Sequence, residues 1–250
     1  MHWRHKVDRG WLEARKQYLT ASEIQTLLPK TPTGRHRNTD KAMLDIWAMK
    51  QAGVTSDDVE SRNAMARGHM LEPYAIQAFN EAEIEPDYAL EHWDNALIFR
   101  GIVAYSPDAL SVPAPDRTVY DGALVQPVLM GEVKAYEPKK HYSTAIADKM
   151  TLEERWQIAT AFYVSDYLEH GYLILFNPNC QHKLFVHKYS RADLRDELEA
   201  VHEVAVNYNA YAANAPRTFS ELDHGASLTE QEIIAELIAQ EAVANGALNP

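Results

Sequence analysis

The 250-residue sequence predicts one α/β domain built on a central mixed sheet that helices flank. Three observations lead to this prediction. Helical spacing of apolar residues dominates the first third of the chain, a cluster of strand-like segments follows, and helices then alternate with strands. Hydrophobic residues make up 46% of the chain, and 24 aromatic rings are available for a core. This composition excludes a chain that is disordered throughout.

The individual elements follow from local signals in chain order. Thr20-Ala21-Ser22-Glu23 is typical of a capped helix start, and apolar residues follow it at helical spacing. Pro73 is expected in the first turn of a new helix. We expect further helices over 11–18, 40–50, 56–83, 138–149, 151–167, 191–211 and 228–245, and strands over 96–99, 101–105, 118–125, 128–136, 171–176 and 183–189. The predicted organisation is one domain over 1–225 and a helical tail over 226–250.

The charge of the chain is acidic but unevenly distributed. The formal net charge is −12, although residues 1–50 hold ten basic side chains against five acidic ones. Residues 201–250 hold one basic side chain against seven acidic ones. An acidic chain excludes a protein that coats nucleic acid through a broad basic surface. A local basic groove near the N-terminus could still attract an anionic ligand.

Cysteine content and hydropathy restrict the class of protein further. Cys180 is the single cysteine, which excludes a disulfide framework, a four-thiolate zinc site and an iron–sulfur cluster. No apolar stretch approaches the 18 residues that a membrane span needs, and the start of the chain has no secretory signal. We therefore expect a soluble protein of a reducing cytoplasm, with no membrane partner.

Three carboxylates and one lysine are the candidates for chemistry. On the strand expected over 128–136, Glu132 and Lys134 point to the same face. Asp108 ends the preceding strand in Ser-Pro-Asp, and Glu72 lies on an earlier helix. Carboxylates that converge at strand ends bind Mg²⁺, which activates water and stabilises charge on a phosphodiester. Lys134 could orient that water. Taken alone, each of these residues is more typical of a turn, a helix start or a surface ion pair.

Taken together, the motifs resemble those of a known nuclease superfamily. Ser106-Pro107-Asp108 followed by Glu132-Val133-Lys134 is similar to the PD-(D/E)XK core, specifically to its lambda exonuclease / YqaJ viral recombinase branch. The branch also has a glycine with a glutamate four residues later, a Trp-x₃-Arg-x₆-Ser pattern and a glutamine-bearing helix after the lysine. These match, in that order, Gly68 and Glu72, then Trp11, Arg15 and Ser22, then Gln157.

The resemblance implies a restriction-endonuclease-like fold and a role for each matched residue. Asp108 and Glu132 would be the main Mg²⁺ ligands with the Val133 carbonyl, and Glu72 would support them; Mn²⁺ is an expected substitute. Lys134 would position the attacking water, with Gln157 beside the site. Arg15 and Ser22 would bind the 5′-phosphate of the degraded strand. Trp11 could be a core residue or could stack near the DNA end.

The sequence departs from the family pattern in two places. Ala109 stands where the family usually has glycine, and 24 residues separate Asp108 from Glu132, which is longer than the usual hairpin. The longer segment contains Asp121, only eleven residues before Glu132, as a rival metal ligand. We prefer Asp108 because it ends a strong predicted strand.

The resemblance implies a Mg²⁺-dependent deoxyribonuclease. Its expected activity is 5′-to-3′ degradation of one strand of linear double-stranded DNA, which leaves 3′ single-stranded overhangs for phage-type recombination. A trimeric ring and a single-strand annealing protein as partner are further implications. The alternatives are a restriction-like endonuclease and a non-catalytic DNA-end-binding protein on the same fold.

Overall fold

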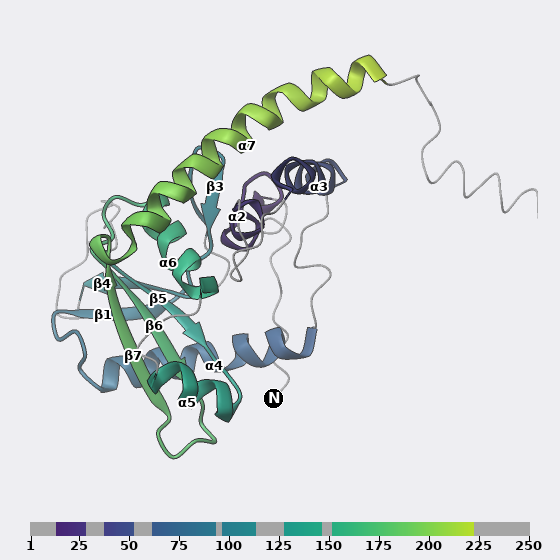
Figure 1. Cartoon of the computed structure of the whole chain (residues 1–250). Helices are drawn as coiled ribbons and strands as arrows, with labels where there is room; N and C mark the ends of the chain where they lie inside the picture. Colours follow the sequence, from purple (N-terminus) through teal and green to yellow (C-terminus); the bar gives the residue numbers. More distant parts are fainter. Residues whose placement is uncertain are drawn as a thin grey trace, which may run out of the picture. The chain divides into compact units, whose positions relative to one another are not determined.

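The computed structural model describes residues 14–28, 38–52, 62–93, 97–113, 128–146 and 152–222. The elements, in chain order, are α2 (Ala21–Leu27), α3 (Thr39–Gln51), α4 (Arg62–Glu81), β1 (Tyr88–His92), β2 (Ile98–Arg100), β3 (Val103–Tyr105), β4 (Ala109–Pro113), β5 (Leu129–Lys134), α5 (Pro138–Ile146), α6 (Leu152–Val164), β6 (His170–Phe176), β7 (Leu184–Ser190), the 3₁₀ turn η2 (Ala192–Leu194) and α7 (Arg195–Leu222). The main body of the chain is a mixed sheet with helices against it (Figure 1).

The central sheet has five strands in the order β1-β4-β5-β6-β7. Strands β5 and β6 are parallel, and every other neighbouring pair is antiparallel. A parallel pair needs a long crossover, and α5 and α6 provide it between β5 and β6. Strands β2 and β3 form a separate antiparallel ribbon. The α/β architecture with a central mixed sheet is therefore confirmed.

The two central strands are covered on both faces. Residues 171–176 of β6 are all buried, as expected for a strand whose two faces both pack against helices. On one face, Ala75, Ile76 and Phe79 of α4 belong to the core cluster that includes Leu129 of β5. The opposite face packs against α6, because a Cβ added to Gly171 would lie 2.5 Å from Cγ2 of Ile158. Figure 1 shows α4 and α6 on these opposite sides.

The N-terminal helices are attached to the small ribbon. The Leu19 amide donates to the Ile102 carbonyl at 2.7 Å, and the Leu19 carbonyl accepts from the Ala104 amide at 2.8 Å. Helix α2 begins directly afterwards with the predicted capping box, in which Glu23 Oε2 accepts from the Thr20 amide at 2.8 Å. This backbone pairing fixes the start of α2 beside β3, from which the chain runs directly to Asp108.

Helix α4 differs from the sequence-based expectation. Pro73 lies inside α4 and does not start a new helix. Proline cannot donate a hydrogen bond to the carbonyl four residues earlier. The helix nevertheless continues because Ala75, Ile76 and Phe79, one turn further on, are buried in the core. Tertiary packing therefore outweighs the local penalty.

The strands also differ from expectation in part. Strands β1 and β4 are not predicted from the sequence. The expected strands at 96–99 and 101–105 are the β2–β3 ribbon, which turns at Gly101 with φ of 58°. The expected strand over 118–125 and the tail over 226–250 lie entirely outside the described residues.

The chain divides into two compact units, residues 1–210 and 211–250. Only residues 211–222 of the second unit, the end of α7, are described. The boundary that we predict at 225 stays a prediction. In the portion of the chain that the structure describes, none of the helices has the length and apolar character of a membrane span.

Candidate active site

The sheet brings Asp108 and Glu132 together despite their separation in sequence. Ala109 of β4 pairs with Gly131 of β5 in antiparallel register, so the next position places Asp108 opposite Glu132. Asp108 Oδ2 accepts a hydrogen bond from the Val133 amide at 2.8 Å. In a strand, the N–H and C=O of one residue point to the same edge, so the Val133 carbonyl also faces Asp108.

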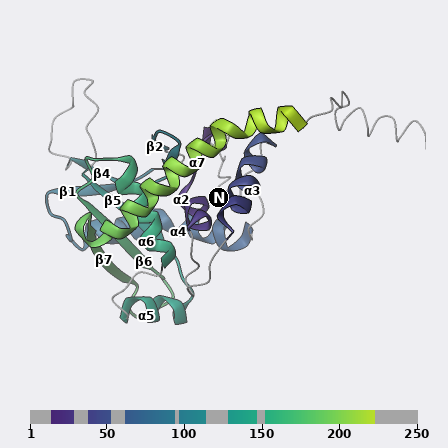
Figure 2. The ribbon, with the colours of Figure 1, turned by 45° about the horizontal axis from the view of Figure 1, so that its top comes forward.

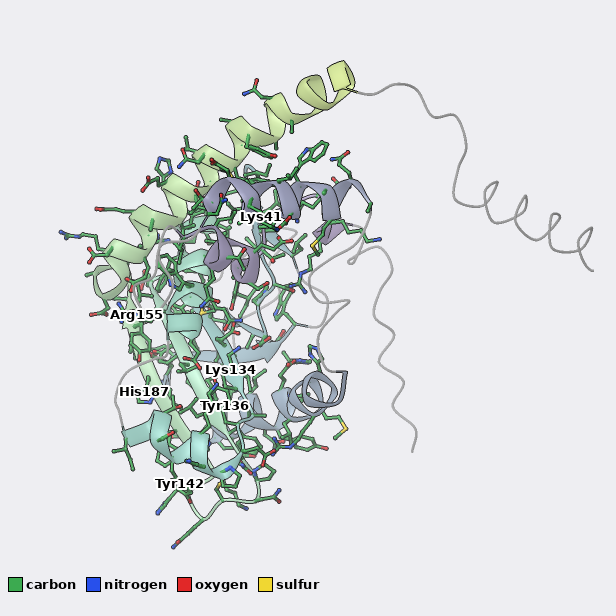
Figure 3. The ribbon with its side chains drawn as sticks, turned by 45° about the vertical axis from the view of Figure 1, so that its right-hand side comes forward. Lys41, Lys134, Tyr136, Tyr142, Arg155 and His187 are labelled. Atoms are coloured by element: carbon green, nitrogen blue, oxygen red, sulfur yellow. The ribbon has the colours of Figure 1, made fainter. Side chains whose placement is uncertain are left out.

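Glu132 is a buried carboxylate with two donors. Its side chain is only 5% exposed, and its Oε1 accepts from Lys134 Nζ at 2.8 Å. Its Oε2 accepts from the hydroxyl of Tyr105 at the end of β3. Burial raises the pKa of Tyr105, and the nearby Glu132 and Asp108 charges raise it further. The phenol therefore stays protonated and donates. Figure 3 shows Lys134 close to Tyr136, two residues further along the chain.

Negative charge is crowded around Asp108. Burial raises the pKa of the Asp108 carboxyl well above its usual value, and the charges of Glu132 and Glu72 raise it further. The Lys134 ammonium and the hydrogen bond from Val133 act in the opposite direction and are outweighed. Such a carboxyl is favourably ionised only when additional positive charge is present.

Glu72 is held by two histidines. Its side chain is 10% exposed, and its carboxylate oxygens lie 3.0 Å from His69 Nδ1 and 3.1 Å from His92 Nε2. Burial alone would raise the pKa of Glu72, but the hydrogen bonds and charges of the two histidines lower it to about 2. Glu72 is therefore ionised, and His92 fixes it against strand β1.

The donor set suits a hard divalent cation. Among the described residues, no three His, Cys, Asp or Glu side chains are arranged to hold a metal ion by themselves. The available donors are instead two crowded carboxylates, Asp108 and Glu132, and the main-chain oxygen of Val133. Oxygen donors of this kind fit Mg²⁺. Gln157 of α6 has a buried carbonyl oxygen, Oε1, with no hydrogen-bond partner in this structure, and its place beside the carboxylates stays a prediction.

Of the other predicted site residues, Arg15 and Ser22 lie among the described residues. Ser22 is exposed in the first turn of α2, with its hydroxyl 3.1 Å from that of Thr20. Arg15 is partly buried just before this helix. Trp11 and the rival ligand Asp121 lie outside the described residues. The phosphate-binding roles of Arg15 and Ser22 stay predictions, as does the choice of Asp108 over Asp121.

Sequence reasoning missed three residues that contact the carboxylates. Tyr105 stands three residues before Asp108, within the motif itself, and its buried strand position was the available signal. His69 precedes Glu72 by three residues on a helix, a spacing at which side chains meet. His92 is brought in by the unpredicted strand β1, so no local signal could have found it.

The fold is the PD-(D/E)XK fold, and the protein is a nuclease, a hydrolase acting on DNA. The family model for the YqaJ-like viral recombinase domain matches residues 10–168. The chain therefore belongs to this family, and the resemblance found in the sequence is confirmed.

Solved structures share the fold. The crystal structure of an alkaline exonuclease, LHK-Exo, from Laribacter hongkongensis is 18% identical in sequence with a TM-score of 0.61. The match covers 86% of this chain and 99% of that one. The structure of LHK-Exo in complex with dAMP has the same identity and coverage and a TM-score of 0.62. A comparison with curated proteins gave no match.

Proposed function

We propose that this protein is a Mg²⁺-dependent exonuclease that degrades one strand of linear double-stranded DNA from 5′ to 3′ and leaves 3′ overhangs for recombination. The observation that carries the proposal is the Lys134 ammonium, bonded at 2.8 Å to buried Glu132, opposite Asp108. This arrangement combines hard oxygen donors with a cation beside them, as hydrolysis of a phosphodiester requires. Mn²⁺ would substitute for Mg²⁺.

Each side chain has a separate task in this proposal. Asp108, Glu132 and the Val133 carbonyl would hold the metal, which when bound polarises the phosphate and lowers the pKa of water. Lys134 Nζ holds the attacking water and stabilises negative charge on the phosphate oxygens. The Tyr105 hydroxyl fixes the Glu132 carboxylate. Glu72, ionised by its histidine partners, adds negative charge that supports cation binding, and Gln157 supplies a neutral acceptor beside the site.

The proposal extends to the ends of the substrate and to partners. Arg15 and Ser22 would bind the 5′-phosphate, because a guanidinium and a hydroxyl at a helix start suit that group. Trp11 would stack near the DNA end. A trimeric ring that encloses DNA and works with a single-strand annealing protein, in the cytoplasm of a bacterium or phage-infected host, completes the proposal. The family match to a viral recombinase domain supports this setting.

The experiment compares three substrates with Mg²⁺ and with EDTA. We expect digestion of a 5′-phosphorylated linear duplex, no digestion of the same DNA as a covalently closed circle, and slower digestion of a duplex with 5′-hydroxyl ends. A label on either strand end gives the polarity. Equal attack on closed circles would exclude an exonuclease in favour of an endonuclease. Binding of ends without any metal-stimulated cleavage would leave only a DNA-end-binding protein.

The Lys134→Ala substitution tests the catalytic assignment. Loss of a cation that stabilises negative charge in the transition state lowers the rate of cleavage by about 100-fold or more. We expect binding of a duplex to change only a few-fold, since a single cation is removed. Lys41→Ala is the matched control, because Lys41 is an exposed lysine paired with Asp45 on α3. Full activity of Lys134→Ala would show that the assignment is wrong.

A further inference from the structure

Helix α5 and the turn between β6 and β7 form a basic surface in an acidic protein. Residues 138–146 and 177–188 together contain four lysines and three histidines and no aspartate or glutamate. The net charge of the whole chain is −12. Lys139, Lys140, His182 and Lys183 are exposed, and we call these four residues the α5 surface. Basic side chains are therefore concentrated in these two segments, and one of them, Lys188, pairs with Glu85.

Specific contacts make the two segments one surface. The buried His141 of α5 lies with Nε2 2.9 Å from the carbonyl of His182 in the turn. The hydroxyl of Tyr142 accepts from the His182 amide at 3.2 Å. The rings of both α5 residues also contact Phe185 at the start of β7. Figures 1 and 2 both show α5 next to this turn.

The positions of the lysines are unfavourable for the helix itself. Lys139 and Lys140 lie in the first turn of α5, which contains no acidic residue. The helix dipole places partial positive charge at this end, where cations are disfavoured. The acidic residue just before the helix, Glu137, pairs with Arg67 of α4 at 3.3 Å. The helix dipole therefore does not explain why lysines stand at this end of α5, whereas binding of an anion does.

Helix α5 follows the active-site strand β5 after a short connection. Only Ala135, Tyr136 and Glu137 separate Lys134 from the first residue of α5. Lys140 Nζ lies 3.7 Å from the centre of the Tyr136 ring, so the lysine stem folds back toward β5. In the view of Figure 3, Tyr136 lies between Lys134 and Tyr142. An extended polyanion with one phosphate at Lys134 would pass along this surface.

We propose that the α5 surface binds the phosphodiester backbone of DNA beside the scissile phosphate. This inference rests on the proposed function and adds a second contact region to it. The lysines read no sequence, because contacts to phosphates carry none directly. They hold the strand in register with Lys134 and contribute to affinity through counterion release.

The test measures how salt affects DNA binding. Wild type, Lys139→Gln, Lys183→Gln and the double variant are titrated with a fluorescent duplex, and separately with one of its strands, in EDTA between 50 and 200 mM salt. Each lysine that contacts a phosphate lowers the slope of log affinity against log salt by about 1. The advantage of wild type over the double variant should therefore shrink about tenfold over this range. Lys41→Gln should leave the slope unchanged.

The outcomes separate this inference from the proposed function. If the double variant has a smaller slope than wild type with the duplex only, the α5 surface contacts double-stranded DNA. If its slope is also smaller with the single strand, the α5 surface contacts the strand that enters the active site. Unchanged slopes with both probes, in a wild type that cleaves linear DNA, overturn this inference only. A wild type that neither binds nor cleaves DNA overturns the proposed function. Circular dichroism and gel filtration confirm that the variants keep their fold and assembly.

Discussion

The hydrogen bond from Tyr105 to Glu132 gives a quantitative prediction about stability. Tyr105→Phe removes only the hydroxyl, which donates to a carboxylate that is almost fully buried. A hydrogen bond to a charged group contributes about 1.5–3 kcal/mol to stability. Removing the donor loses this contribution when the acceptor stays buried without a replacement partner. The second donor, Lys134, remains on the other oxygen. We therefore expect a free energy of unfolding about 2 kcal/mol lower than that of wild type.

Thermal unfolding in EDTA measures this loss without a contribution from bound metal. For a chain of about this size, 2 kcal/mol corresponds to a decrease in Tm of about 4–8 °C. Tyr74→Phe is the matched control, because Tyr74 is 62% exposed on α4 and the same atom is removed. Its Tm should change by less than about 2 °C. If both variants unfold at the same temperature as wild type, the Tyr105 hydroxyl does not stabilise Glu132 and the reasoning fails.

Two further predictions concern packing and charge. Gly171→Ala should lower the free energy of unfolding by about 1–3 kcal/mol in urea, since the new methyl group would lie 2.5 Å from Ile158. Gly68→Ala, a helical position with no atom within 4 Å of the added carbon, should instead raise it by up to about 1 kcal/mol. Burial raises the pKa of Glu85, but hydrogen bonds from Lys188 and Tyr172 outweigh this and lower it below the ordinary 4.5. Ionised Glu85 therefore stabilises the folded state fully above pH 4.5, and this stabilisation is lost as the pH falls below 4.5 and the carboxylate takes up a proton. Glu85→Gln should unfold with a weaker pH dependence between pH 5 and 3, and an unchanged dependence would contradict the assignment.

Site residues could be predicted from the sequence where they follow a clear pattern of local secondary structure. Glu132 and Lys134 follow an apolar strand, so their common face was predictable. Asp108 follows a predicted strand, but its position opposite Glu132 depends on the register of β4, which begins directly after it and which the sequence did not reveal. Strand order and register are non-local properties, which residue periodicity does not report.

The differences at Pro73 and at β1 have the same physical origin, which is contact between distant parts of the chain. Pro73 is a local helix-breaking signal, and long-range packing of α4 against the sheet outweighs it. Strand β1 reads Tyr-Ala-Leu-Glu-His, with one fully buried residue, Leu90, so its apolar pattern is weak. Its pairing with β4 stabilises it and brings His92 to Glu72. Residues that act through contacts between distant parts of the chain, as His92 does, are found only from the structure.

The short pairing of β4 with β5 affects how variants of Asp108 must be interpreted. At one end, the Ser111 hydroxyl accepts from the amides of Val128 and Leu129, and at the other the Asp108 carboxylate accepts from the Val133 amide. Side chains thus replace main-chain acceptors at both ends of the ladder. An inactive Asp108→Ala protein would combine the loss of the proposed metal ligand with a frayed strand edge. Asp108→Asn retains an oxygen for Val133 and so separates the electrostatic role of this residue from its architectural one.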